Sequence, residues 1–304
     1  MVDTTPGYDP SSGGSTYLLE PRDYSCILID EPAEGVRRIT LNRPDKRNAI
    51  NHALRGDVMH ALTAADIDDS VRVSIVRGAG TCFSAGYDLG GGNAGQQPAF
   101  YSAQGDGYWA RYNIETWMQI WDLAKPVIAQ VHGYCLAGGS ELATGCDLVY
   151  VAKNTQMGYP AVRFGVPDMH FHPWLLGMRL GMEMLLTGDS ISGEEAAARG
   201  WATRCYDDEE LESEVLTMAT RIAQLPADIV QLNKRAVHRQ MEVMGLRSGM
   251  RAGAELCTLG VHQQSFTSFM ANTGGGKTLT KALQERDEAF GDYRTKKKAK
   301  KPDS

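Results

Sequence analysis

The chain has 304 residues, of which 42% are hydrophobic and 22% charged, and its formal net charge at pH 7 is -6. This length supplies enough apolar material for one large domain or two small ones. The acidic balance excludes an overall basic field, so we expect neither nucleic acid nor a membrane as a partner. Only the tail at residues 295–304 is strongly basic, and such terminal lysine runs are usually solvated and disordered.

The six cysteines are scattered through the chain and form no CxxC pair. This pattern favours reduced thiols over a disulfide framework or a zinc site, and we expect no bound metal. Residues 1–20 lack the basic and apolar regions of a signal peptide, and their polar composition predicts a flexible arm. No apolar run approaches the roughly 20 residues that a membrane span requires. We therefore expect a soluble, cytoplasmic protein.

The chain begins with a strand pattern and continues with a helix pattern. Residues 24–44 contain two β-type runs around a short loop, which predicts a hairpin at the edge of a sheet. Residues 48–68 follow, with Leu54, Val58 and Leu62 at the spacing of one helix face.

Buried strands and helices then alternate. Apolar runs at residues 71–80, 127–134 and 146–152 predict buried strands, and residues 108–123 predict a helix rich in aromatic side chains. This alternation predicts an α/β fold with mostly parallel strands.

Beyond Pro167 the pattern becomes helical, and from Glu209 onward it stays so. Ser192 with Glu195 forms a capping box, which marks a helix start. We see no internal repeat and expect one α/β core followed by a helical region. The predicted boundaries are an N-terminal arm at 1–20, a core at 21–225, a helical C-terminal region at 226–294 and a basic tail at 295–304.

Three weaker signals are set aside. The run TGGGKT from Thr273 is similar to a phosphate-binding loop, but Ala271 stands where that motif needs glycine, so we expect a loop between helices. His170 and His172 have no third metal ligand at a suitable spacing. The aromatic residues of segment 101–121 are interpreted mainly as helix-face packing, although some could line an apolar pocket.

Glycine turns follow two of the predicted strands, and both are expected to lead into a helix. Residues 83–89 read FSAGYDL, and residues 134–150 read YCLAGGSELATGCDLVY. The second turn fits a phosphate cradle, an oxyanion site or a packing turn with an incidental surface glutamate. Ligands of α/β sheets bind at the C-terminal ends of strands, where two adjacent turns can aim two N–H donors at one oxygen. A thioester carbonyl that gains negative charge during reaction would be stabilised there.

Four segments occur in a characteristic order: GVRRITLNRPDKRNAI, GTCFSAGYDL, KPVIAQVHGYCLAGGSELATGCDLVYVA and TGDSISGEEAAARGWATRCY. Together they resemble the crotonase superfamily, the enoyl-CoA hydratase/isomerase family, from about Tyr24 to Leu225. The resemblance implies a ββα-repeat spiral core with a helical C-terminal trimerisation region, and assembly as a homotrimer or homohexamer. It also implies an acyl-CoA substrate, no permanently bound cofactor and an oxyanion hole formed by the amides of Tyr87 and Gly138.

Hydratases of this family carry two glutamates that flank the substrate. The first corresponds to Glu141, directly after the glycine turn, where a carboxylate can act as general acid or base. A capping role for Glu141 is the alternative. The second glutamate is expected just after the GYP turn, where this chain has Ala161. A methyl group transfers no proton, so the two-glutamate mechanism does not apply unchanged.

A substitute for the second glutamate is sought nearby. Asp168 lies close to where the family's dienoyl-CoA isomerases and dehalogenase carry an aspartate, and it is the candidate second acid or base. A loop-capping aspartate is the alternative. His170 and His172 are other candidate proton carriers, since histidine titrates near neutral pH. Arg163 could pair with one of the carboxylates.

For coenzyme A, the resemblance implies that Arg43, Lys46 and Arg47 lie near the phosphates and that backbone around Ser84 and Ala85 lies near the adenine. A plain solvated loop is the alternative for the basic residues. The leading hypothesis is an acyl-CoA enzyme, a lyase or isomerase of the kind used in fatty acid metabolism. Its net reaction stays open among hydration, double-bond migration, and thioester or C–C hydrolysis. The alternative is a catalytically silent acyl-CoA-binding protein.

Overall fold

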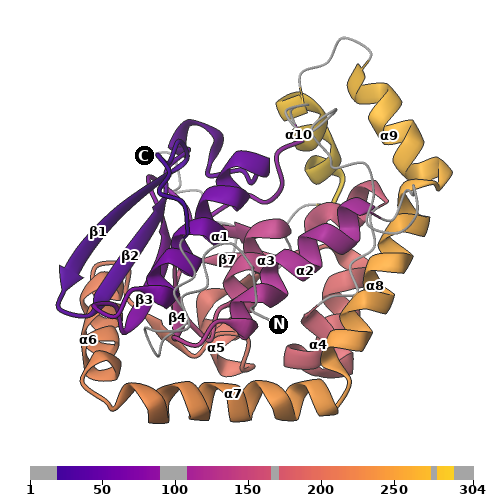
Figure 1. Cartoon of the computed structure of the whole chain (residues 1–304). Helices are drawn as coiled ribbons and strands as arrows, with labels where there is room; N and C mark the ends of the chain where they lie inside the picture. The colour runs from indigo at the N-terminus through magenta and orange to yellow at the C-terminus, as the bar shows by residue number, and fades with distance from the viewer. Residues whose placement is uncertain (1–18, 90–107, 166–170, 275–278, 291–304) are drawn as a thin grey trace, which may run out of the picture.

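The computed structural model describes residues 19–89, 108–165, 171–274 and 279–290 (Figure 1). A six-stranded sheet, ordered β1-β2-β3-β4-β6-β9, forms the centre of these residues. Its strands are β1 (Ile27–Ala33), β2 (Val36–Leu41), β3 (Val73–Gly78), β4 (Val127–Val131), β6 (Leu148–Ala152) and β9 (Arg204–Tyr206). The edge strand β1 pairs antiparallel with β2, and all the other neighbours are parallel. The predicted mostly parallel α/β fold and its edge hairpin are confirmed.

Ten α-helices and two short 3-10 helices lie in the described residues. The α-helices are α1 (His52–Ile67), α2 (Tyr108–Asp122), α3 (Gly138–Gly145), α4 (His172–Thr187), α5 (Gly193–Ala198), α6 (Leu211–Ala223), α7 (Ala227–Val243), α8 (Leu246–Val261), α9 (Gln264–Gly274) and α10 (Leu279–Phe290). The 3-10 helices are η1 (Pro44–Lys46) and η2 (Pro160–Phe164).

Both faces of the large sheet are covered by apolar cores. Successive residues of a strand point to opposite faces, so each strand contributes side chains to both cores. Ile39, Val76 and Ala129 lie in register across β2, β3 and β4 and belong to the core that includes α1 and α3. Their neighbours Ile75 and Ile128 face the other way, into a second core with α6. Packing on both faces therefore fixes the large sheet, which supports the segments that follow β3 and β5.

A second, three-stranded sheet carries the glycine-rich turn. It is ordered β5-β7-β8 and consists of β5 (Tyr134–Leu136), β7 (Gln156–Gly158) and β8 (Ile191–Ser192). The strand predicted at residues 127–134 is present as β4 but ends at Val131, and Tyr134 already belongs to β5 of the second sheet. Ser192 caps α5 and accepts a hydrogen bond from the Glu195 amide at 3.1 Å, which confirms the predicted helix start.

The C-terminal region is helical, as predicted. Figure 1 shows α7 along the bottom of the view and α8 rising beside α2 and α4. Ile114 and Met118 of α2 pack against Leu246 and Met250 of α8. No helix in the described part of the chain is both long and apolar enough to cross a membrane. The predicted arm and basic tail fall almost wholly on residues 1–18 and 291–304, outside the described residues.

Candidate active site

Ala137 turns the chain from β5 into α3. Its φ is 46° and its ψ is -120°, a conformation that L-residues rarely adopt and that costs of order 1–3 kcal/mol. The turn is held by the Ala137 amide, which donates to the Gly158 carbonyl at 2.8 Å, and by the Glu141 amide, which donates back to the Ala137 carbonyl at 3.0 Å. Gly138 and Gly139 then open α3, where the first N–H groups lack partners inside the helix.

Close approach of the earlier turn explains why both positions are glycine. A Cβ on Gly138 would lie 2.7 Å from the Tyr87 ring, and one on Gly139 would lie 2.6 Å from the Ser84 carbonyl oxygen. Gly86 has a φ of +104°, and a Cβ there would lie 2.9 Å from the Leu136 carbonyl oxygen. No larger side chain fits at any of the three positions without movement of a neighbour.

Backbone hydrogen bonds join the two turns directly. The Ser84 amide donates to the Tyr134 carbonyl at 2.9 Å, and the Leu136 amide donates to the Ser84 carbonyl at 3.1 Å. The side-by-side arrangement expected from the sequence is therefore present. The helix expected after the first turn falls on residues 90–107, which lie outside the described part of the chain.

Glu141 lies in the first turn of α3 and is only 1% exposed. The Tyr87 hydroxyl donates a short hydrogen bond to Glu141 Oε2. The indole Nε1–H of Trp117, on α2, donates to the Tyr87 hydroxyl oxygen at 3.1 Å. Burial, and secondly the Glu141 charge, raises the pKa of Tyr87 well above its ordinary value, so the phenol stays protonated at neutral pH. The carboxylate thus has a permanent donor beside it.

Two side chains of this arrangement were not predicted. From the sequence, only the backbone amide of Tyr87 was expected in the site, and Trp117 was expected to pack on a helix face. Trp117 is fully buried and belongs to the core, but its indole nitrogen also bonds the Tyr87 hydroxyl. Tyrosine and tryptophan usually find a polar partner when buried, which was the signal available in the sequence.

Ala161 lies in η2 and is 6% exposed, packed in a small apolar cluster with Tyr159. No proton-transferring group therefore occupies this position. His172 is 1% exposed and lies edge-on to the rings of Tyr159 and Trp201, at centroid distances of 5.9 and 4.9 Å. Asp168 and His170 lie outside the described residues.

Arg163 pairs with carboxylates other than those considered from the sequence. Its guanidinium donates to Asp189 Oδ1 at 2.6 Å and to Asp287 Oδ1 at 3.2 Å. Its Nε also donates to the Thr187 carbonyl at 3.1 Å. Arg163 therefore ties η2 to the end of α4 and to α10, and these partners occupy its guanidinium.

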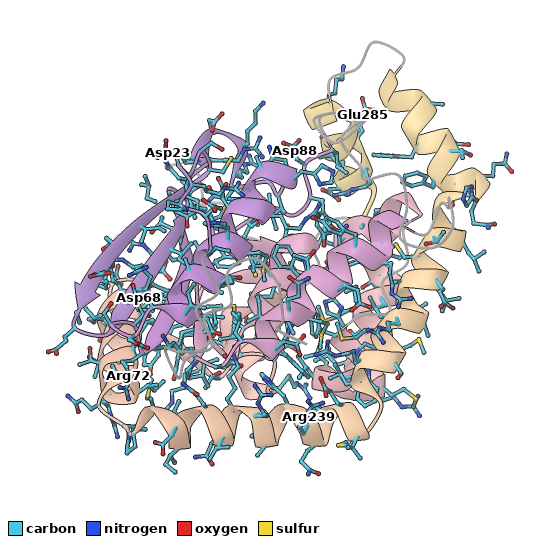
Figure 2. All side chains as sticks on the ribbon, in the orientation of Figure 1. Asp23, Asp68, Arg72, Asp88, Arg239 and Glu285 are labelled. Carbon is cyan, nitrogen blue, oxygen red and sulfur yellow. The ribbon has the colours of Figure 1, made fainter. Side chains whose placement is uncertain are left out.

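The predicted coenzyme A loop divides into a fixed and an exposed part. Arg43 bonds the Ala49 carbonyl and pairs with Asp88, labelled in Figure 2, at 2.9 Å. Lys46 and Arg47 are exposed on η1 and its C-cap. The Arg47 carbonyl accepts from the Ala85 amide at 3.0 Å, which fixes the loop against the first glycine turn.

The Ser84 side chain also holds the loop that carries Lys46 and Arg47. Its hydroxyl donates to the Asn48 carbonyl at 2.9 Å and accepts from the Gly86 amide at 3.2 Å. The five predicted coenzyme A residues are therefore brought to one region. Among the described residues, no three His, Cys, Asp or Glu side chains are grouped to hold a metal ion.

Known proteins share this sequence and fold. Residues 31–290 match the model of the family described as Enoyl-CoA hydratase/isomerase. The 2,3-dehydroadipyl-CoA hydratase of Escherichia coli is 31% identical over 86% of this chain and 98% of its own length. A crystal structure of an enoyl-CoA hydratase/isomerase from Xanthobacter autotrophicus is 32% identical, with a TM-score of 0.79 over 88% of this chain and 99% of that one.

An enoyl-CoA hydratase from Mycobacterium smegmatis is similar at 27% identity, with a TM-score of 0.80 over 89% of this chain and 97% of that one. The family match over residues 31–290 spans both glycine turns and the helical C-terminal region. The chain therefore belongs to the enoyl-CoA hydratase/isomerase family of the crotonase superfamily.

Proposed function

We propose that the protein transforms enoyl-CoA thioesters, with the amides of Tyr87 and Gly138 as the oxyanion hole and Glu141 as the general acid or base. The observation that carries this proposal is the position of Glu141: a carboxylate 1% exposed, in the first turn of α3, three residues after Gly138. Negative charge that develops on the thioester oxygen is stabilised by two such donors, each worth roughly 3 kcal/mol of barrier. Glu141 then moves the proton at the neighbouring carbon.

The Tyr87 hydroxyl and the Trp117 indole position this carboxylate. Because the phenol keeps its proton, it donates steadily to Oε2 of Glu141 and fixes the orientation of the carboxylate. We assign Tyr87 two separate tasks, since its backbone amide faces the substrate oxygen while its side chain orients Glu141.

Because Ala161 lies in an apolar cluster and transfers no proton, Glu141 without a second group can catalyse only some of the candidate reactions. Migration of a double bond from C3 to C2 removes a proton from C2 and returns one at C4, so one carboxylate suffices. Hydration adds hydroxide at C3 and a proton at C2, which needs a second group to share the proton transfers. We assign that group to Asp168 and expect Asp168→Asn to lose hydration while migration persists. Full hydration activity in Asp168→Asn would show that this assignment is wrong.

For coenzyme A we propose phosphate contacts from Lys46 and Arg47, supported by their exposure on η1. Arg43 shapes the loop through Asp88, and backbone at Ser84 and Ala85 contacts the adenine. Lys46→Ala combined with Arg47→Ala should raise KM for every thioester and weaken free coenzyme A equally. A selective effect on one acyl group would contradict this role.

We further propose a homotrimer or homohexamer assembled through the C-terminal helices. Large apolar side chains are exposed on α4 and α7: Leu186 at 73%, Leu232 at 63% and Val243 at 83%. A second copy of the chain would remove these surfaces from water. Sedimentation of the purified protein should give three or six chains per particle, and a monomer would contradict the proposal.

A spectrophotometric assay tests the catalytic proposal. Conjugation of the thioester should appear with 3-enoyl substrates and disappear with 2-enoyl substrates. Glu141→Gln should slow both changes by a factor on the order of 100 or more. Glu214→Gln, at an exposed glutamate of α6, is the matched control and should leave the rates unchanged. Tight binding of thioesters with no turnover by the unmodified protein would instead support the silent acyl-CoA-binding function that Ala161 suggests.

A further inference from the structure

Arg55 is a buried cation that has no carboxylate partner in the part of the chain that the structure describes. It lies in the first turn of α1 and is 2% exposed. Its guanidinium bonds Asn113 Oδ1 and His52 Nδ1 and lies 4.3 Å from the centroid of the Tyr112 ring. Within the described residues it forms no ion pair, whereas the other buried cation, Lys234, pairs with Asp147 at 2.9 Å.

After the hydrogen bonds inside this cluster are formed, the polar groups that remain without partners are all N–H donors. Arginine cannot accept a hydrogen bond, so His52 Nδ1 and Asn113 Oδ1 are both the accepting atoms. The neutral His52 ring then carries its proton on Nε2, and Asn113 keeps two N–H groups on Nδ2. His52 Nε2, Asn113 Nδ2 and Arg55 Nε are buried without hydrogen-bond partners in the described structure. A buried group that supplies acceptors and negative charge would satisfy all three.

The Arg55 cluster, defined as His52, Arg55 and Asn113, is connected through α2 to the residues that hold Glu141. Asn113 and Trp117 are one helical turn apart on α2, and Trp117 bonds the hydroxyl that holds Glu141. The Arg55 charge also contributes a lowering effect on the pKa of Tyr87, which places the guanidinium within electrostatic reach of that ring. We take the acyl part of a substrate bound at Glu141 to extend towards this cluster.

A buried guanidinium is costly to fold around unless an anion compensates it. Asp189 and Asp287 supply that anion for Arg163, whereas no carboxylate among the described residues supplies it for Arg55. Arginine presents a planar fork of N–H groups that matches a carboxylate, and the Asn113 amide extends the fork. The missing anion is then best supplied by the ligand.

We propose that the Arg55 cluster binds a carboxylate carried by the acyl group, so that the preferred substrates are CoA monothioesters of dicarboxylic acids. This inference rests on the proposed function, because it takes the acyl part to lie beside Glu141. The CoA phosphates are the other source of anionic oxygen. The exposed Lys46 and Arg47 serve those phosphates better, since a phosphate needs no burial.

Paired substrates test the proposal in the full-length protein. For each chain length in a series, kcat/KM is measured for the 2-enoyl thioester that ends in a methyl group and for the one that ends in a carboxylate. At the length that spans the site, the carboxylate should raise kcat/KM by at least about tenfold. Arg55→Met should remove this preference and spare the methyl-ended substrates. Arg199→Met, at an exposed arginine, is the control and should keep the preference.

Binding supplies a readout independent of turnover. Calorimetry with saturated monothioesters, which do not react, should show the same preference in the unmodified protein and its loss in Arg55→Met. Arg55→Lys keeps the charge and should retain part of the preference, which covers a failure of Arg55→Met to fold.

Equal kcat/KM for both substrate types at every chain length would overturn the inference and leave the catalytic proposal intact. Equal weakening of all thioesters and of free coenzyme A by Arg55→Met would also overturn it, because Arg55 would then serve the phosphates. Absence of any turnover would instead contradict the proposed function, and calorimetry would still decide this inference.

Discussion

Arg55 and Arg163 are both held away from water, yet their surroundings differ. Arg163, with 8% of its side chain exposed, has Asp189 at 2.6 Å and Asp287 at 3.2 Å. Arg55, at 2% exposure, has a neutral amide, a histidine and an aromatic ring. One cation is compensated within the chain and joins three elements. The other, Arg55, bonds Asn113 of α2, one helical turn from Trp117.

Arg163 belongs to a structural ion pair and Arg55 is proposed to be a binding group. Mutation of each residue can measure this difference. Removal of one member of a buried pair leaves the other charge uncompensated, which is strongly destabilising. Removal of a buried charge that has no counter-ion removes a desolvation penalty instead. The same substitution at the two sites should therefore act on different properties, namely stability at Arg163 and substrate choice at Arg55.

The largest effect is expected for Arg163→Met. Asp189, which is 5% exposed, would be left buried without its partner, and the free energy of unfolding should fall by about 3–5 kcal/mol. Urea denaturation followed by circular dichroism measures this change. Arg239, labelled in Figure 2, forms a surface pair with Glu242, so Arg239→Met should cost less than about 1 kcal/mol. Equal losses in the two variants would remove the structural role of Arg163.

Asn113→Asp should make Arg55 resemble Arg163. The new carboxylate has the shape of the amide and accepts a charge-assisted hydrogen bond from the guanidinium. We expect the free energy of unfolding to rise by about 1–2 kcal/mol and the preference for carboxylate-ended substrates to disappear. Denaturation and paired kinetics on one preparation test both. A destabilised variant that still prefers carboxylates would show that Arg55 is not an available cation.

Arg55→Met should change stability little. The lost contacts with Asn113 and Tyr112 oppose the relief of burying an unpaired charge, so the net change should stay within about 1 kcal/mol. The denaturation experiment used for Arg163→Met measures it under the same conditions. A loss as large as that of Arg163→Met would place Arg55 among the structural arginines.

The smallest expected effect is a change in the pKa of His52. Burial, and secondly the Arg55 charge, lowers the pKa of His52 below its ordinary value of 6.5. Between that lowered pKa and 6.5 the unfolded chain binds a proton that the folded chain refuses, so the His52 contribution to stability is lost as the pH falls through this window. In Arg55→Met the His52 pKa should rise towards 6.5, followed by NMR of the imidazole protons. An unchanged His52 pKa would contradict the electrostatic coupling between the two residues.

Much of the fold follows from local pattern. Apolar runs predicted the buried strands β3, β4 and β6, and the Ser192 capping box predicted the start of α5. The small sheet was missed because β5, β7 and β8 contain only 3, 3 and 2 residues, too few for a periodic signal. Such strands are defined by pairing between distant segments, which tertiary structure decides.

The candidate site was predictable in its backbone and less so in its side chains. Glycines after strands identified both turns, and the family resemblance together with its place in the second turn identified Glu141. The bond from Tyr87 to Glu141 joins residues 54 positions apart, and no spacing rule predicts it. Arg55 did carry a signal, because its position lies three residues before Val58 on the buried face of α1, where a charge is unexpected.

We propose that Glu141 performs the proton transfer at a thioester held by the two turns. Single-turnover rates with enzyme in excess, for the unmodified protein and Glu141→Gln, test it most directly when thioester affinity is measured on the same samples. We predict nearly unchanged affinity and a chemical step slowed by a factor on the order of 100 or more. A Glu141→Gln variant that binds the thioester and converts it at the unmodified rate would contradict the account.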